Sequence, residues 1–95
     1  MSQIETIYLT ASARLSDRPT LIFSVDFYSD TKNEGVVIYD ANSANDERKI
    51  AHISGAADAD CFRDYSRPIE TTYGCYVELE SGVSEVTLQI RRGID

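Results

Sequence analysis

The stretch that decides the fold lies at the carboxyl end of the chain, where residues 75–92 read CYVELESGVSEVTLQIRR. Apolar and polar side chains alternate in both halves of this stretch. A period of two is typical of a strand with one buried face. Ser81 and Gly82 separate the two halves and suit a tight turn. We therefore predict an antiparallel hairpin with strands at 72–80 and 83–92.

Residues 21–28 are predicted to form a central strand, because both of their faces carry apolar side chains. The more strongly apolar face consists of Leu21, Phe23, Val25 and Phe27. Residues that tolerate turns follow at 29–35, and residues 36–40 resume the strand pattern. A second hairpin with a longer loop, formed by 21–28 and 36–40, follows from this arrangement.

Three shorter segments also carry strand signals. Residues 3–12 and 49–53 are rich in β-branched side chains and predict two further strands. Residues 69–72 are expected to extend the first strand of the carboxyl-terminal hairpin backwards. Residues 41–48 contain Asn and Ser, which favour loop conformations, so this segment is predicted to be a loop.

The fold class follows from these segments. No part of the chain shows a sustained apolar stripe at helical spacing. We therefore predict an all-β protein, an antiparallel β-sandwich or a small jelly-roll-like barrel of about six to eight short strands. Because no linker or internal repeat divides the chain, residues 1–95 are interpreted as a single β domain.

Composition narrows the possible functions. With 9 Lys and Arg against 16 Asp and Glu, the formal net charge is -7. Such a chain repels phosphate backbones, so no nucleic-acid partner is predicted. No stretch approaches the roughly 20 consecutive apolar residues of a membrane helix, and the first residues lack the pattern of a signal peptide. We therefore expect no membrane partner and a chain that is not exported.

Groups suited to catalysis are few. Cys75 falls on the apolar side of its strand, whereas Cys61 is placed in a polar loop. Two cysteines without a CxxC pair do not make a zinc site, and a disulfide is disfavoured in a chain that is not exported. His52, the single imidazole, has no nucleophile motif beside it, so we expect an exposed or edge-strand histidine. We predict no catalytic residue, no cofactor and no metal ligand, and interpret the protein as a non-enzyme.

Acidic residues in the middle of the chain allow two interpretations. Oxygen-bearing side chains at 40–47 resemble a calcium loop, but Asn45 stands where an EF-hand requires glycine, so that pattern fails. A weaker calcium site in this segment, or at Asp58 and Asp60, is one interpretation. A solvated acidic loop is the other.

Tyrosine and arginine side chains are the candidates for contacts with a partner. The chain has six Tyr, and Arg outnumbers Lys by seven to two. Arginine pairs with carboxylates through two hydrogen bonds and stacks on aromatic rings, which suits interfaces. The alternative is that the rings cover the ends of the core and the arginines are ordinary surface charge. The predicted interface residues are Tyr8, Tyr28, Arg63, Tyr65, Arg67, Tyr73 and Tyr76.

The order of several short motifs resembles small structural proteins of tailed bacteriophages. In chain order these motifs are Leu9-Thr10-Ala11, the strand at 19–28, Val37-Ile38-Tyr39-Asp40-Ala41, Lys49-Ile50-Ala51-His52-Ile53, and Gly74-Cys75-Tyr76-Val77-Glu78-Leu79 leading into Val86-Thr87-Leu88-Gln89-Ile90-Arg91. The resemblance covers about residues 8–92. This sequence departs from the family in having Asp, Glu and Arg where Gly, Ser and Thr are expected.

The resemblance implies a compact β-sandwich in the virion, either a capsid decoration (cement) protein or a head-tail accessory protein. Such a protein does no bond chemistry; it binds and stabilises the head lattice, and it passes through the cytoplasm of the infected host during assembly. The implied partners are the major capsid protein or other virion proteins. A homo-oligomer is expected, with a trimer favoured. Residues 1–12 and the Tyr- and Arg-bearing loop at 60–73 are the alternative contact surfaces.

A ligand-binding β-sandwich is the alternative function, as a carbohydrate or host-receptor module of a tail or accessory protein. Tyr65, Tyr73 and Tyr76, with acids nearby, would form its aromatic platform. The absence of Trp counts against this interpretation. A small hydrolase is a third alternative, which needs two carboxylates held in a cleft.

Overall fold

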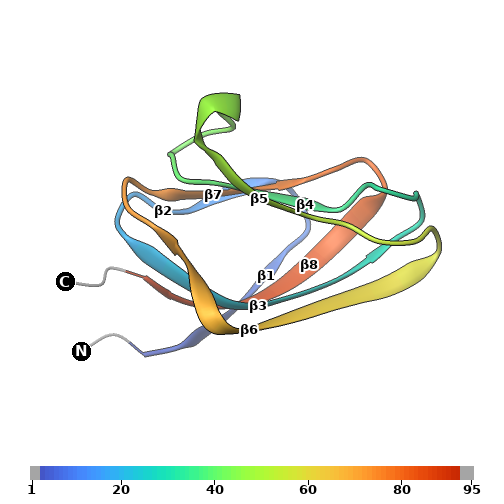
Figure 1. The fold of residues 1–95 in the computed structure, drawn as a ribbon, viewed down its shortest axis with the longest axis horizontal. Helices are drawn as coiled ribbons and strands as arrows, with labels where there is room; N and C mark the ends of the chain where they lie inside the picture. Colours follow the sequence, from blue (N-terminus) through green and yellow to red (C-terminus); the bar gives the residue numbers. More distant parts are fainter. Residues whose placement is uncertain (1–2, 93–95) are drawn as a thin grey trace.

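The computed structural model describes residues 3–92, which form two four-stranded antiparallel sheets packed face to face (Figure 1). The elements in chain order are β1 (Glu5–Leu9), β2 (Ala13–Ser16), β3 (Thr20–Ser29), β4 (Val36–Tyr39), the 3-10 turn η1 (Asp46–Arg48), β5 (Lys49–Ile53), β6 (Ala59–Thr71), β7 (Cys75–Leu79) and β8 (Val83–Arg92). Sheet A has the order β1-β8-β3-β6, and sheet B has the order β2-β7-β4-β5. The predicted all-β sandwich is confirmed; the two sheets stay separate and do not close into a barrel.

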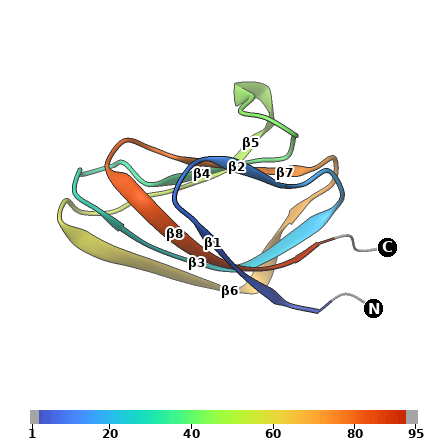
Figure 2. The ribbon, with the colours of Figure 1, turned by 180° about the vertical axis from the view of Figure 1, so that it is seen from behind.

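The chain visits the two sheets in the order of a jelly roll. β1 pairs with β8, β2 with β7, β3 with β6 and β4 with β5, so the chain is doubled back on itself around the β4–β5 connection. Among the described strands, β4 and β5 are the one pair of sequence neighbours that also pair in a sheet. Every other connection crosses from one sheet to the other, which Figure 2 shows from behind.

Both predicted hairpins are therefore wrong, although their strands exist. β7 and β8 lie in opposite sheets, and so do β3 and β4. The predicted turn does form, since the amide of Val83 donates to the carbonyl oxygen of Glu80 at 2.9 Å. That turn carries the chain across the end of the sandwich. A Cβ atom at Gly82 would lie 2.9 Å from the Ser29 hydroxyl, so any larger residue at this close crossing would force the neighbouring side chains to move.

Strand β3 changes the face that it presents to the core. Its ladders to both neighbours shift register between Ile22 and Ser24, which is a bulge. Ile22 is fully buried, and Val25 and Phe27 follow it into the core. Leu21 and Phe23 are half-buried and lie outside the core cluster. The predicted apolar face is therefore correct only in its second half, because the bulge resets the alternation.

Residues 60–73 are not a loop. Most of them belong to β6, an edge strand of 13 residues. Cys61 lies opposite Phe27 and is 6% exposed, so its predicted position in a polar loop is also wrong. Residues 69–71 belong to β6 rather than to β7, and Thr72 lies in the turn that follows. The four residues 65–68 stand opposite a single residue of β3, and β6 bends there (Figure 1).

Several predictions about local structure are confirmed. β1 falls within 3–12, β5 coincides with 49–53, and β3 is an interior strand of sheet A. The segment 41–48 is a loop that ends in one 3-10 turn. Residues 1 and 2 of the predicted contact surface at 1–12 lie outside the described residues.

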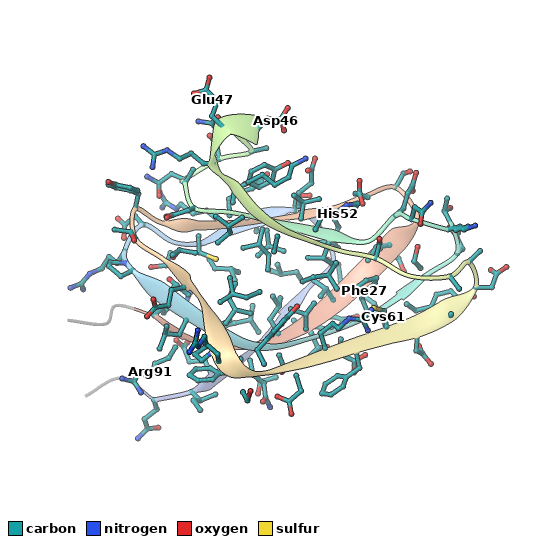
Figure 3. The ribbon with its side chains drawn as sticks, in the orientation of Figure 1. Phe27, Asp46, Glu47, His52, Cys61 and Arg91 are labelled. Carbon is teal, nitrogen blue, oxygen red and sulfur yellow. The ribbon has the colours of Figure 1, made fainter. Side chains whose placement is uncertain are left out.

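The core lies between the sheets and draws on both of them. Its fully buried aliphatic side chains are Ile22, Val25, Val36, Ile38, Val77, Val86, Leu88 and Ile90. Cys75 is fully buried as predicted, and both cysteines are free thiols. In Figure 3 Phe27 and Cys61 are labelled on the two neighbouring strands β3 and β6. Residues 3–92 include no helix long and apolar enough to cross a membrane.

Candidate functional site

The tyrosines predicted for an interface do not share one surface. Tyr8 and Tyr28 are exposed on β1 and β3 of sheet A. Tyr73 is 60% exposed in the turn after β6, where the guanidinium carbon of Arg48 lies 4.5 Å from its ring centre. Tyr76 is half-buried on β7 of sheet B, opposite Tyr39. The structure therefore places these side chains on opposite sides of the molecule.

The other predicted interface residues lie on β6. Tyr65 is half-buried against the core, and this burial raises the pKa of its phenol. Arg63 and Arg67 are exposed. The Arg63 guanidinium donates a hydrogen bond to the carbonyl oxygen of Phe62 at 3.1 Å. Both arginines thus sit at an edge of sheet A.

One row of directly opposed side chains crosses sheet A from edge to edge. Tyr8 of β1 pairs with Thr87 of β8, Thr87 pairs with Asp26 of β3, and Asp26 pairs with Phe62 of β6. Directly paired residues project from the same face of a sheet. Tyr8 is 59% exposed and Phe62 is 57% exposed. Strands lie about 4.8 Å apart, so roughly 14 Å separates the backbones that carry the two rings.

A second row runs beside the first on the same face. It consists of Thr6, Gln89, Ser24 and Asp64, again one residue from each strand. Two shallow depressions lie along the two rows and share Asp26 and Thr87 in their lining. Tyr28, Asp60 and Glu85 also line them. We call the surface formed by the two rows and these three residues the outer trough.

The outer trough is acidic. Glu85 accepts a hydrogen bond from the Tyr8 hydroxyl. Within residues 3–92, no hydrogen bond or ion pair joins the carboxylates of Asp26, Asp60 or Asp64 to another side chain. Among the described residues that line the two depressions there is no Lys or Arg. The described lining of the two depressions therefore presents carboxylates without a cation among them, and Arg91 lies on the same face of β8, two residues beyond Gln89.

The two tyrosines of the outer trough are held as neutral hydrogen-bond donors. The hydrogen bond to Glu85 raises the pKa of the Tyr8 hydroxyl. Partial desolvation and a hydrogen bond to Asp58, with a distance of 3.2 Å, raise the pKa of Tyr28. Asp58, one of the alternative calcium ligands considered from the sequence, thus accepts a hydrogen bond from the Tyr28 hydroxyl.

A separate polar cluster holds the loop at 41–48 against the turn after β6. The Asp40 carboxylate accepts hydrogen bonds from the amides of Thr72 at 2.9 Å and Tyr73 at 2.7 Å. Burial, with a smaller contribution from this carboxylate, raises the pKa of the Cys75 thiol to about 12.

Within residues 3–92, no three His, Cys, Asp or Glu side chains are grouped as a metal ion would need.

His52 lies on the edge strand β5 (Figure 3). Through one carboxylate it is joined to Glu80, which follows β7, and to Gly35, which precedes β4. Its Nε2 atom is 2.6 Å from Oε1 of Glu80, and the same oxygen accepts the amide of Gly35 at 2.8 Å. The expected edge-strand histidine is confirmed. Its partner is a carboxylate that also fixes a backbone amide, so the pair has a structural role.

The side chains of the outer trough are of kinds that can contact another molecule. Tyr8 and Phe62 offer aromatic surfaces for stacking, and Asp26 and Asp64 offer hydrogen-bond acceptors. The interface residues predicted from the sequence include Tyr8 and Tyr28 of this surface but not Phe62 and Asp26, because the alignment of these residues depends on the register of four strands. Neither a protein-family model nor a curated protein sequence matches this chain.

Proposed function

We propose that the protein is a non-enzymatic virion structural protein of a tailed bacteriophage, a capsid decoration protein that binds and stabilises the head lattice. The observation that carries the proposal is the row Tyr8–Thr87–Asp26–Phe62, which sets exposed aromatic rings at opposite edges of one sheet. The motif order described above supports it. So does the jelly-roll strand order, which viral capsid domains share.

The two contact surfaces predicted as alternatives from the sequence come together in this proposal. Residues 1–12 contain β1 and residues 60–73 contain most of β6, and these are the two edge strands of sheet A. A partner that covers the outer trough contacts both strands at once. The alternatives left open by the sequence are thus combined into one docking face.

Energetics also favour a role in a repeated lattice. Burying an exposed aromatic ring contributes about 1.5 to 3 kcal/mol, and interface energy is concentrated in such anchors. Two anchors give a modest affinity for one copy, which multivalency amplifies on a lattice of identical sites. The proposal includes a trimer at a local three-fold axis of the head, with the major capsid protein or another virion protein as partner.

Mass spectrometry of purified particles tests the proposal. Particles of the phage that encodes this chain are expected to contain the protein in many copies. Its absence from particles that carry the other structural proteins would overturn the proposal. Light scattering behind a sizing column adds the oligomeric state, since a trimer has three times the 10.6 kDa mass of the chain.

Variants then locate the docking face. Phe62→Ser and Tyr8→Ser are expected to reduce the copy number on particles, because each removes an exposed ring from the outer trough. Tyr73→Ser is the matched control, since Tyr73 is 60% exposed on another part of the molecule. If Tyr73→Ser lowers the copy number on particles as much as the trough variants do, the docking face does not lie on the outer trough.

Binding of a carbohydrate is the second candidate function, and the outer trough favours it more than the platform expected from the sequence. Tyr65 is half-buried, Tyr73 lies in the turn after β6, and Tyr76 lies on β7 of sheet B, so the three rings do not form one platform. The trough sets rings on both sides of hydroxyl, amide and carboxylate groups, a combination suited to sugar hydroxyls. A glycan array with no signal above background would remove this candidate.

A further inference from the structure

We infer that the outer trough accepts arginine side chains from an exposed segment of the partner protein. The inference rests on the proposed function and specifies the chemistry of the partner at that same face. It is carried by the unpartnered sheet face described above, by its charge and by its exposed rings.

Charge selects a cationic partner. Asp26, Asp60, Asp64 and Glu85 line two adjoining depressions, and no Lys or Arg is among the described lining residues. Like charges on one face repel, and this repulsion persists when a neutral surface covers them and grows as water is excluded. A cationic side chain removes the repulsion and is drawn to the face before contact. An anionic partner is disfavoured for the same reason.

The exposed rings select arginine over lysine. A guanidinium group is planar, so it stacks on a ring while it donates hydrogen bonds to a carboxylate in its own plane. Phe62 stands directly opposite Asp26, about 5 Å away between Cβ atoms. Asp64 lies two residues along the same strand, roughly 7 Å from Phe62. A guanidinium over the Phe62 ring therefore has a carboxylate on each of two sides.

The molecule already uses both kinds of arginine contact within its own fold. The Arg48 guanidinium carbon lies 4.5 Å from the centre of the Tyr73 ring. Arg92 donates two hydrogen bonds to the carboxylate of Glu5, at 3.0 and 2.9 Å. The outer trough offers a ring and a carboxylate side by side, so it combines the two contacts in one place.

The experiment is a titration of the isotope-labelled full chain followed by NMR. The probes are two capped peptides, acetyl-GRGRG-amide and acetyl-GKGKG-amide. The arginine peptide is expected to shift backbone amides of the two rows and to bind about threefold more tightly than the lysine peptide. Its affinity is expected to fall as salt is added, because exposed charges are screened.

Two double variants separate the trough from overall charge. Asp26→Asn with Asp64→Asn removes two carboxylates from the trough. Asp46→Asn with Glu47→Gln removes two from the tip of the loop on the sheet B side, where Figure 3 labels both residues. Each pair changes the net charge equally. We expect the first pair to weaken binding of the arginine peptide at least fivefold and the second to leave it within twofold, on the order expected for exposed ion pairs.

Three outcomes would overturn the inference. These are equal losses for the two double variants, equal affinity for the two peptides, and binding of the neutral trisaccharide maltotriose in the trough without binding of the arginine peptide. Dispersed amide spectra of each variant establish that it is folded before binding is compared. A protein that is present in particles but fails these tests loses only this inference, whereas absence from particles overturns the proposed function itself.

Discussion

The outer faces of the two sheets differ in how fully their side chains are buried and hydrogen-bonded within the chain itself. On sheet B, Val37 and Tyr39 point away from the core cluster, yet each is only 3% exposed. The Tyr39 hydroxyl donates to Glu78 at 2.6 Å, and its ring lies 6.2 Å from that of Tyr76. On sheet A the outer trough leaves its rings and carboxylates to solvent. Burial of Val37 and Tyr39 stabilises the fold, and the open face of sheet A is the one on which we propose that a partner docks.

The largest expected effect comes from Gly35, at the end of sheet B. A Cβ atom there would lie 1.9 Å from the carbonyl oxygen of Ile53, a backbone atom that cannot easily move. Gly35→Ala is expected to lower the free energy of unfolding by about 3 kcal/mol or more. Urea denaturation followed by circular dichroism measures this. Gly55→Ala is the control, because its Cβ meets only the Cys61 sulfur at 3.9 Å; equal losses for the two variants would contradict the expectation.

Alkaline pH should lower the free energy of unfolding through ionisation of the Cys75 thiol in sheet B. Its pKa is raised from 9.0 to about 12 in the folded chain, so the folded state binds this proton more tightly than the unfolded state. The contribution is therefore complete below pH 9.0 and is lost as pH rises towards about 12. Unfolding free energies measured across this range should fall more steeply for the native chain than for Cys75→Ala. Cys61→Ala keeps Cys75 and should retain the steeper slope.

Loss of one hydroxyl on sheet B gives a smaller effect. Tyr39→Phe removes the donor to Glu78, and we expect the free energy of unfolding to fall by about 1 kcal/mol. The same hydrogen bond raises the pKa of Tyr39 to about 12, so this tyrosine should ionise late in an alkaline absorbance titration. Tyr8→Phe is the matched change on sheet A, and it should alter stability less because Tyr8 is 59% exposed. A larger loss of unfolding free energy for Tyr8→Phe than for Tyr39→Phe would contradict the comparison of the two faces.

The smallest effect is expected in the outer trough itself. Asp26→Asn removes one of several like charges that have no partner among the described residues. Unfolding in urea should show a free energy that is raised by up to about 0.5 kcal/mol. Asp40→Asn should lower it, because that carboxylate accepts the amides of Thr72 and Tyr73. A clear loss of stability in Asp26→Asn would mean that the trough carries a structural role.

The positions of the strands could be predicted because alternation is a local property of the sequence. β5 and β8 begin and end where the pattern places them, at 49–53 and 83–92. The pairing of strands could not be predicted in this way, because the same turn serves a hairpin and a crossing between sheets. The crossing is held by Glu34, whose carboxylate accepts the amide of Gly82 at 2.7 Å and the hydroxyl of Ser81 at 2.8 Å. Those contacts join residues far apart in the chain.

The outer trough was harder to foresee than the fold. Its main row needs three strand pairings in the correct register, and one slipped residue would turn a side chain to the other face. The bulge beside Phe23 makes such a slip within β3. The position of Phe62 on this face could not be predicted, because a loop at 60–73 assigns its side chains to neither face of a sheet. A strand through this segment would have placed Phe62 on the face opposite to Cys61.

The bend in β6 has a consequence for how the protein behaves at high concentration. A long, straight edge strand offers unpaired backbone groups on which another chain can add a strand, and repeated addition leads to aggregates. In β6 the regular ladder stops at Asp64 and resumes at Ile69, and Pro68 within the gap has no amide hydrogen to donate. The exposed edge is thereby divided into two short pieces. The β6 edge of sheet A therefore resists fibril-like growth.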